Sequence, residues 1–418
     1  VYIIALIFLF FGAEKLKPFI CCALILLTCG ELVVNGYTDM VGLSKEHKYE
    51  LRSEYARYDN RIGEAVDFVH ERDDGFYRME KTFSRTDNDN MSFGLNGMTH
   101  YSSTFNSNVL SFNSRMGMLQ VYVRIRYLGS TLLTDSLLGV KYVLADKKVN
   151  DEYVALKETE DYKVYENPYA LQIGFSADES ALGVPDYGSS GMENQDKFAE
   201  SILGESFVDR VQNVSSANSG AGREFRAPED GLYYIDFGRM YNGKIELTVN
   251  GRSVSYDYDT TPSYDNQYKK IYCLGSYDRN DRIRVTGNDP DSMSSVKIYR
   301  VDNDRFEEAC LEKCDNGSLN ITDYGSTWLE GEIALEDDQV LFTTIPYEKG
   351  WKAYIDGERV DTECAQETFL AVRAEAGEHT VKLKYSAPGL APALTVSILT
   401  LAGILIYVFR LRIFSIIK

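Results

Sequence analysis

The chain has 418 residues and a formal net charge of −19, because 63 Asp and Glu outnumber 44 Lys and Arg. Its length accommodates two or three domains. Its acidity argues against a nucleic-acid partner, since phosphate recognition requires a basic patch. The seven cysteines are too few for a disulfide scaffold, and Cys310 and Cys314 lack the second Cys or His pair that a zinc site requires. A single disulfide among the four cysteines outside the apolar segments stays open.

Two apolar segments open the chain. Residues 1–12 carry no charge, but twelve helical residues reach only about 18 Å, which is too short to cross a bilayer. We expect this segment to be the end of a transmembrane helix of a longer protein. A signal peptide is the alternative, although no basic region precedes the apolar run. A loop with Lys15 and Lys17 leads to a second span at 19–34, so residues 1–34 are expected to form two transmembrane helices, the first truncated.

A third apolar segment lies near the end of the chain. Residues 391–409 contain no charge and are long enough to cross a hydrocarbon core of about 30 Å. Basic residues follow this segment in a tail at 410–418, and lysines precede the span at 19–34. Basic flanks of membrane spans stay in the cytoplasm. Both signals therefore predict a multi-pass protein of the cell membrane, with residues 35–390 on the extracytoplasmic side.

The extracytoplasmic region begins with an expected α+β domain at residues 35–177. Its sequence combines near-helical apolar spacing with short apolar runs that are typical of strands. The expected elements are helices within 42–58, a strand at 76–84, a helix at 132–138 capped by Gly139, a strand at 141–145, and two strands within 161–177 that are broken at Asn167-Pro168.

Residues 178–304 are expected to form a β-sandwich domain. A stretch rich in Gly, Ser, Asp and Pro marks its boundary at 178–194, and a helix is expected at 195–207. From Glu224 onward, strands recur about every ten residues, which is typical of a β-sandwich. Asn250-Gly251 is the expected tight turn within it.

A second β-rich domain is assigned to residues 305–390 and is reached through a connector at 302–318. Two hairpins are expected in it, one turning at Asp356-Gly357 and the other at Ala376-Gly377. Trp351 falls on the apolar side of the first hairpin and is expected in the core. The expected fold is therefore a membrane-anchored α+β and β protein. Its transmembrane helices flank a large extracytoplasmic region with one α+β unit and two β-sandwich-like units.

No motif in the chain identifies an enzyme. The four histidines are scattered, and neither a nucleophile elbow nor a phosphate-binding loop is present. Several loops carry paired acids or amides whose oxygens suit calcium, but none completes an EF-hand pattern, so solvated turns are expected and no metal or cofactor is assigned. Examples of these loops carry Asp87, Asp89 and Asn90, Asp257 and Asp259, and Asp289 and Asp291.

Several segments together resemble the C-terminal portion of the YfhO family of bacterial membrane proteins. They are FYRMEKTFS with its following polar loop, LLGVKYVLA, YENPYALQIGF, and LFTTIPYEKGWKAYIDGE with AGEHTVKLKYSAPGL. The resemblance implies a glycosyltransferase-like membrane protein of the C-type architecture. Such a protein transfers sugar from a polyprenyl-phosphate-linked donor to teichoic-type polymers of the cell wall, including lipoteichoic acid. The acidic base or metal ligand of the family would lie upstream of Val1, so no catalytic residue is assigned.

Acceptor binding is the leading hypothesis for this part of the chain. Within the polar loop at 87–106, Asp89, Asn96 and Tyr101 are the candidate acceptor-binding residues, because polar loops on a rigid scaffold carry sites more often than strands do. The expected partners are membrane lipid, the lipid-linked sugar and the cell-wall polymer. The alternatives are a non-enzymatic, membrane-anchored module that binds glycan or has a structural role, and a subunit of a transporter or flippase.

Overall fold

The computed structural model describes residues 14–46, 51–146, 148–159, 162–217, 221–241, 245–254, 269–337 and 339–416. The chain forms two compact units, residues 1–64 and residues 65–418. The predicted truncated span at 1–12 lies outside the described residues, and so do Asp257 and Asp259. The division of the chain into the six regions expected from the sequence stays a prediction.

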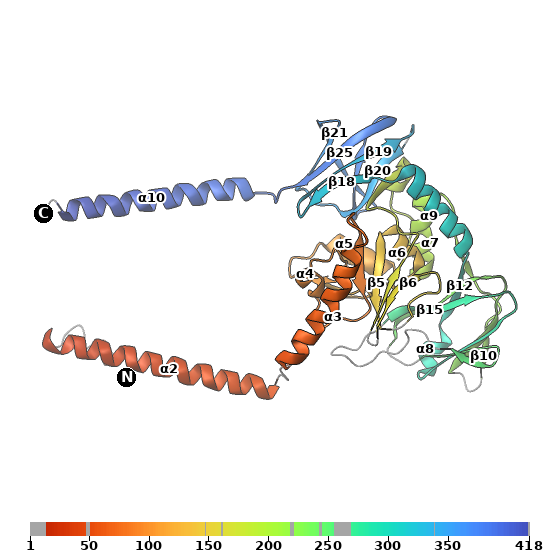
Figure 1. The fold of residues 1–418 in the computed structure, drawn as a ribbon, viewed down its shortest axis with the longest axis horizontal. Coiled ribbons are helices and arrows are strands. Elements are labelled where there is room, and N and C mark those ends of the chain that lie inside the picture. The colour runs from red at the N-terminus through yellow and green to blue at the C-terminus, as the bar shows by residue number, and fades with distance from the viewer. Residues whose placement is uncertain are drawn as a thin grey trace. The chain divides into compact units, whose positions relative to one another are not determined.

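Two long apolar helices contain the predicted spans at 19–34 and 391–409 (Figure 1). In the part of the chain that is described, these two are long and apolar enough to cross a membrane. Their large apolar side chains are exposed, which leaves an apolar surface that lipid can cover. The N-terminal elements are η1 (Glu14–Leu16), α2 (Lys17–Glu46) and α3 (Arg52–His70), and the C-terminal helix is α10 (Leu390–Ile416).

A four-stranded mixed sheet begins the second unit. Its order is β1-β5-β7-β6, with β1 parallel to β5 and the other neighbours antiparallel. The predicted helix at 132–138 is confirmed, and Gly139 follows it with a φ of +72°, where a glycine is favoured. The elements are β1 (Arg78–Lys81), α6 (Leu132–Leu137), β5 (Val140–Ala145), β6 (Val154–Glu158) and β7 (Lys163–Glu166).

Short elements between β1 and α6 carry the predicted acceptor loop. Three two-residue strands pair in the order β2-β4-β3. Asn106 caps the longer of the two helices by accepting a hydrogen bond from the Asn108 backbone N–H at 2.9 Å. The elements are α4 (Asp89–Ser92), β2 (His100–Tyr101), α5 (Ser107–Arg115), β3 (Gln120–Val121) and β4 (Arg124–Ile125).

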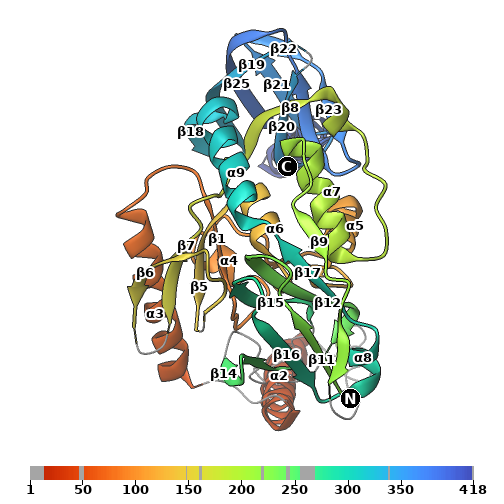
Figure 2. The same ribbon diagram turned by 90° about the vertical axis from the view of Figure 1, so that its right-hand side faces the viewer.

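Figure 2 shows the strands of two antiparallel sheets in the central region. These sheets share one apolar core, to which Phe225, Tyr233 and Ile283 contribute. Their orders are β10-β11-β16-β13-β14 and β15-β12-β17-β9. The predicted turn at Asn250-Gly251 is confirmed, with φ of 50° and 82°. The strands are β9 (Val208–Arg210), β10 (Ser215–Ala217), β11 (Gly222–Arg226), β12 (Gly231–Tyr241), β13 (Ile245–Val249), β14 (Arg252–Val254), β15 (Lys269–Tyr277), β16 (Arg282–Gly287) and β17 (Lys297–Val301). The helices of this region are α7 (Gly191–Leu203) and α8 (Pro290–Ser294).

Two further sheets contain the C-terminal strands. One has the order β18-β19-β25-β21-β22, and we call it the terminal sheet; the other has the order β23-β24-β20-β8. The turn at Asp356-Gly357 joins β21 to β22, as predicted. The elements are β8 (Gly174–Asp178), η2 (Glu179–Leu182), β18 (Asn320–Gly325), β19 (Trp328–Leu335), β20 (Gln339–Pro346), β21 (Trp351–Ile355), β22 (Glu358–Val360), β23 (Thr362–Ala365), β24 (Phe369–Arg373) and β25 (Gly377–Tyr385).

The second predicted hairpin is wrong. Strand β24 pairs with β20 and β23, whereas β25 pairs with β19 and β21, so the chain crosses between sheets at Ala376-Gly377. The reason lies in the burial of β24 on both faces. Phe369 packs in one apolar core, while Leu370 packs in the core that also holds Val381 of β25. A hairpin would place both strands in one sheet and leave one face of β24 without this cover.

The predicted connector at 302–318 is also wrong, because the chain there forms helix α9 (Asn303–Gly317). Its N-cap Asp302 accepts a hydrogen bond from the Arg305 backbone N–H at 3.4 Å. Phe306 and Cys310 are fully buried four residues apart, so they lie on one face of the helix. The charged residues between them conceal this apolar spacing in the sequence.

Candidate functional site

The predicted acceptor loop folds around a buried carboxylate, Glu80 of β1. Glu80 is fully buried and accepts hydrogen bonds from the backbone N–H groups of Met98 and Thr99, the second at 2.8 Å. The hydroxyl of Thr99 donates to the other carboxylate oxygen at 2.9 Å. Because a buried charge needs such donors, Glu80 orders the segment that leads into β2.

The amide of Asn90 links this carboxylate to a buried cation. Its Nδ2 lies 3.3 Å from both carboxylate oxygens of Glu80, and its Oδ1 accepts a hydrogen bond from Lys81 Nζ at 2.6 Å. Burial lowers the pKa of Lys81, against the opposing effect of the acidic neighbours Glu80 and Asp89. Gly97 allows the close approach, because a Cβ there would lie 2.0 Å from Asn90 Nδ2. The cavity beside these residues measures about 10 Å³, so it has room for no more than a single water.

Asp89, the first candidate acceptor-binding residue, makes internal hydrogen bonds. It is 2% exposed. Its carboxylate accepts from the backbone N–H groups of Arg85 and Thr86, at 2.8 and 3.0 Å, and from the Thr86 hydroxyl at 2.8 Å. These bonds close the turn that precedes α4. They account for the acidic residue at this position without a ligand.

Asn96 and Tyr101, the other two candidates, are exposed. Asn96 contacts the residue before β1 through its side chain, whose Nδ2 donates to the Tyr77 carbonyl oxygen at 3.4 Å. Tyr101 lies in β2 opposite Arg124 of β4, and the Arg124 guanidinium carbon lies 5.6 Å from the centre of the tyrosine ring. Tyr101 is therefore the candidate that presents a large exposed side chain over a cation.

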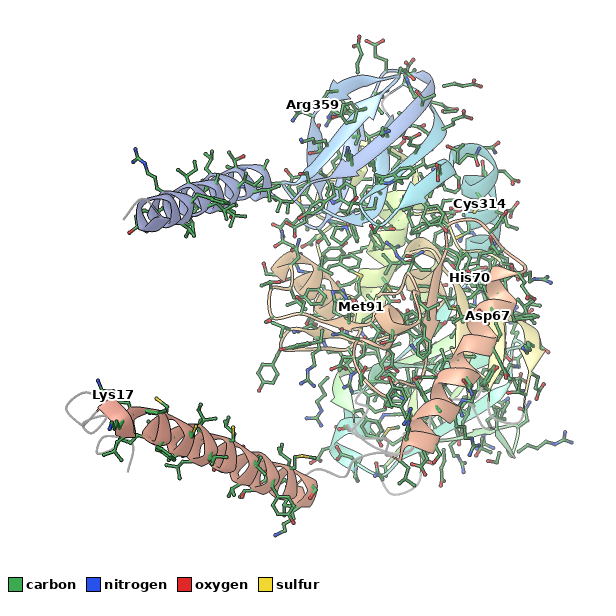
Figure 3. The ribbon with its side chains drawn as sticks, turned by 60° about the vertical axis from the view of Figure 1, so that its left-hand side comes forward. Lys17, Asp67, His70, Met91, Cys314 and Arg359 are labelled. Atoms are coloured by element: carbon green, nitrogen blue, oxygen red, sulfur yellow. The ribbon has the colours of Figure 1, made fainter. Side chains whose placement is uncertain are left out.

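The Asp87 carboxylate forms ion pairs with the two arginines beside Tyr101, Arg124 and Arg126. Asp87 lies 2.6 Å from Arg126 Nε and 3.4 Å from Arg124 Nε. The neighbouring Tyr122 is 86% exposed and has a φ of 53°, a backbone conformation that is uncommon for a residue with a side chain. Figure 3 shows Met91, another exposed side chain of this loop region, on α4. Tyr101, Tyr122 and the two arginines form a polar and aromatic surface, which we call the tyrosine-arginine surface.

The buried carboxyl group of Asp135 in helix α6 is a further feature that the sequence did not reveal. It accepts hydrogen bonds from the hydroxyls of Ser130, Tyr127 and Tyr153. Burial raises the pKa of Asp135 to about 6, although these three hydrogen bonds act to lower it. Apolar spacing does not reveal this group, because Asp135 lies between buried leucines of α6 and its burial depends on how three hydroxyl groups from outside the helix are folded onto it.

The raised pKa of Asp135 predicts a pH dependence of folding stability. Between pH 3.8 and about 6 the folded chain binds more protons at this group than the unfolded chain, so its contribution is largest at low pH and is lost as pH rises through about 6. We expect the unfolding free energy of the wild type, minus that of Asp135→Asn, to fall by about 2 kcal/mol from pH 4 to pH 7. Urea unfolding followed by circular dichroism measures it. The exposed Asp323→Asn is the control, and a difference that is flat or rises with pH would contradict the prediction.

Surface hollows lie on the terminal sheet. One of them has a volume of about 440 Å³ and is lined by Thr322, Glu330, Tyr354 and Lys382, among others. Lys382 and Glu330 form an ion pair within it. Sequence reasoning could not assemble this groove, because its residues come from four strands that are distant in the chain.

The described residues contain neither a metal-binding cluster nor a disulfide bond. No group of three or more His, Cys, Asp or Glu side chains is placed to hold a metal ion there. Asp289, from one of the paired-acid loops, caps α8 by accepting from the Asp291 backbone N–H at 3.1 Å. All seven cysteines are free thiols. The disulfide that the sequence left open is therefore not formed in this structure.

Comparison with known proteins gives a family and a curated relative. A family model described as bacterial membrane protein YfhO matches residues 1–397. A Bacillus subtilis (strain 168) protein with the name Uncharacterized protein YfhO is 27% identical over 396 residues, which cover 82% of this chain and 44% of that protein. The chain thus spans less than half the length of this relative.

Similar solved structures give only weak matches. A conserved protein from Pseudomonas aeruginosa PAO1 is 11% identical, with a TM-score of 0.14 over 43% of this chain and 92% of that chain. A GH2 β-galacturonidase from Eisenbergiella tayi, bound to galacturonate, is 11% identical, with a TM-score of 0.13 over 40% of this chain and 29% of that chain. Matches at this level carry no argument about function.

Proposed function

Because the chain belongs to the YfhO family of bacterial membrane proteins, we propose that it is the extracytoplasmic, C-terminal part of a glycosyltransferase-like membrane protein. Helices α2 and α10 cross the cell membrane, and residues 35–390 lie outside. The basic residues at Lys15, Lys17 and in the tail at 410–418 support this orientation. The two sheets around the central core support a β-sandwich-like unit at 178–304, and those around the C-terminal core support one at 305–390 to which β8 adds an edge strand from outside these bounds.

The chemistry belongs to a region that precedes this chain. This chain spans 44% of its B. subtilis relative, which leaves room for further membrane spans and an acidic residue in an early outer loop. That region takes the sugar from a polyprenyl-phosphate carrier. The part described above holds the acceptor, a teichoic-type polymer of the cell wall, near the outer mouth of the active site.

The tyrosine-arginine surface is the observation that best supports acceptor binding by this part of the chain. Tyr101 is 43% exposed, so one ring face is free to stack on a sugar while Arg124 supports the other. Arg124 also supplies a positive charge for the phosphates of a teichoic-type polymer. Asp89 contributes by closing the loop, since its carboxylate already accepts three hydrogen bonds.

Replacing Tyr101 with alanine should weaken binding of lipoteichoic acid about fivefold, because stacking on an aromatic ring contributes about 1 kcal/mol. Tyr101→Phe retains the ring and should bind within about twofold of the wild type. Equilibrium binding to the full chain in detergent micelles measures both. Matched alanine replacement of the exposed Tyr324 in β18 is the control. Equal binding by Tyr101→Ala and the wild type would refute the role of this surface.

The two alternatives predict other outcomes. A non-enzymatic glycan-binding module would bind polymer with the same dependence on Tyr101, yet the longer protein would transfer no sugar from a lipid-linked donor. A transporter or flippase subunit would show neither transfer nor binding that depends on Tyr101. Sugar transfer by the longer protein in membrane vesicles therefore separates the proposed function from both.

A further inference from the structure

The two tryptophans of the chain lie at one end of the terminal sheet. Trp328 of β19 is aligned with Lys384 of β25, and Trp351 of β21 is aligned with Tyr385, the next residue of β25, so the two indoles leave opposite faces of the sheet. The rings of Trp351 and Tyr385 pack at 5.3 Å between their centres. Both tryptophans are half-buried, and Trp351 packs against the apolar core on its face of the sheet.

Two lysines stand opposite each other at the same end of the sheet. Lys352 of β21 is the direct cross-strand partner of Lys384 of β25, so both side chains leave the same face, and both are exposed. Like charges that are directly opposite across an antiparallel pair are unfavourable. No ion pair of either lysine is found in the described part of the chain, whereas Lys382, one row along the same face, pairs with Glu330. An acidic chain therefore concentrates uncompensated positive charge at this point.

A short linker connects this end of the terminal sheet to helix α10. Strand β25 ends at Tyr385, and α10 begins at Leu390. The four intervening residues allow Lys384 to lie at most about 20 Å from the start of the helix, because an extended chain advances about 3.5 Å per residue. The backbone N–H of Ser386 donates to the Gly350 carbonyl oxygen at 3.0 Å, which fixes the start of this link on the sheet.

From these observations we propose that the row of Trp328, Lys352 and Lys384, on one face of the terminal sheet, is a membrane-contact surface for anionic phospholipid headgroups. The lysines bind lipid phosphate, and the Trp328 indole lies in the headgroup region. Tryptophan is enriched at this depth because its ring is apolar and its N–H is polar. The surface should prefer anionic over neutral lipid, because each lysine near an anionic membrane surface raises the affinity for that membrane about fivefold. The inference rests on the proposed crossing of the membrane by α10.

Trp328 makes the surface directly measurable in a Trp351→Phe background, which removes the emission of the tryptophan that packs against the core. We would reconstitute the chain in lipid nanodiscs and compare quenching of its tryptophan emission by lipids brominated near the headgroup and near the end of the acyl chain. Stronger quenching by the shallow label is expected, and it should increase with the fraction of phosphatidylglycerol. Lys352→Gln with Lys384→Gln should lose this dependence on phosphatidylglycerol, whereas Arg279→Gln, a matched change in an exposed turn between β15 and β16, should retain it.

Protection of α10 from protease in the same nanodiscs separates the two proposals. Protected α10 with no quenching by the shallow label would overturn the membrane-contact surface and leave the proposed span intact. Quenching that is equal in neutral and anionic lipid would overturn the role of the lysines and with it the selection of anionic headgroups. Digestion of α10 would refute the proposed topology and this inference together. Circular dichroism of each variant checks that the fold is kept.

Discussion

Replacing Glu80 with alanine is expected to lower the free energy of unfolding by about 3–5 kcal/mol. The carboxylate is fully buried and accepts from two backbone N–H groups, the Thr99 hydroxyl and the Asn90 amide. Alanine would leave these donors without an acceptor and would leave the Lys81 ammonium in a buried site without its anionic neighbour. The loss should appear as an earlier midpoint of urea unfolding, followed by circular dichroism.

Two further variants serve as controls for the Glu80→Ala prediction. Glu80→Gln keeps the shape and one acceptor oxygen, so its loss should be smaller than that of Glu80→Ala. Glu332→Ala removes a carboxylate from an exposed position of β19 and should change stability by less than about 0.5 kcal/mol. A Glu80→Ala chain as stable as the Glu332→Ala chain would show that the loop does not depend on this carboxylate.

Replacing Arg78 with methionine is expected to lower the unfolding free energy by about 3 kcal/mol. The Arg78 guanidinium joins two distant segments. It donates to the Leu138 carbonyl oxygen and, at 2.7 and 3.0 Å, to the hydroxyl and carbonyl oxygens of Thr344 in β20. Burial lowers the pKa of Arg78 to about 10, against the opposing effect of Glu80, yet the group stays charged at neutral pH.

The lysine variant tests whether the forked shape of the guanidinium matters. Arg78→Lys keeps the charge but cannot reach the three acceptors in one plane, so we expect at least half of the loss seen with methionine. Thermal unfolding of both variants would measure the effect. Methionine and wild-type chains with the same unfolding midpoint would show that β1 and β20 are held together without this residue.

Most regular elements could be predicted because their signals are local. The helix at 132–138 follows from its apolar spacing and from Gly139, whose φ of +72° favours glycine. The turns at Asn250-Gly251 and Asp356-Gly357 follow from residues that accept positive φ. The exchange of partners after β24 could not be predicted, because apolar alternation gives the period of a strand and does not name its neighbour.

The candidate site was only partly predictable for the same reason. A polar loop rich in Asn and Asp is visible in the sequence, and Tyr101 within it is exposed, as an acceptor-binding residue must be. The burial of Asp89 was not visible, because its partners are backbone N–H groups that any residue can offer. Glu80 reads as an ordinary residue of a strand, and its role depends on Asn90 and Thr99, which are distant in sequence.

The central claim is that residues 35–390 form the outer part of a membrane protein, and the native Cys364 tests it most directly. Cys364 is an exposed thiol in β23, whereas Cys310 is buried. A membrane-impermeant maleimide added to intact cells should label the protein, and Cys364→Ser should remove most of the label. Burial raises the pKa of the Cys364 thiol, so the reaction is best run at mildly alkaline pH. Labelling that requires permeabilised cells would place this region in the cytoplasm and contradict the account.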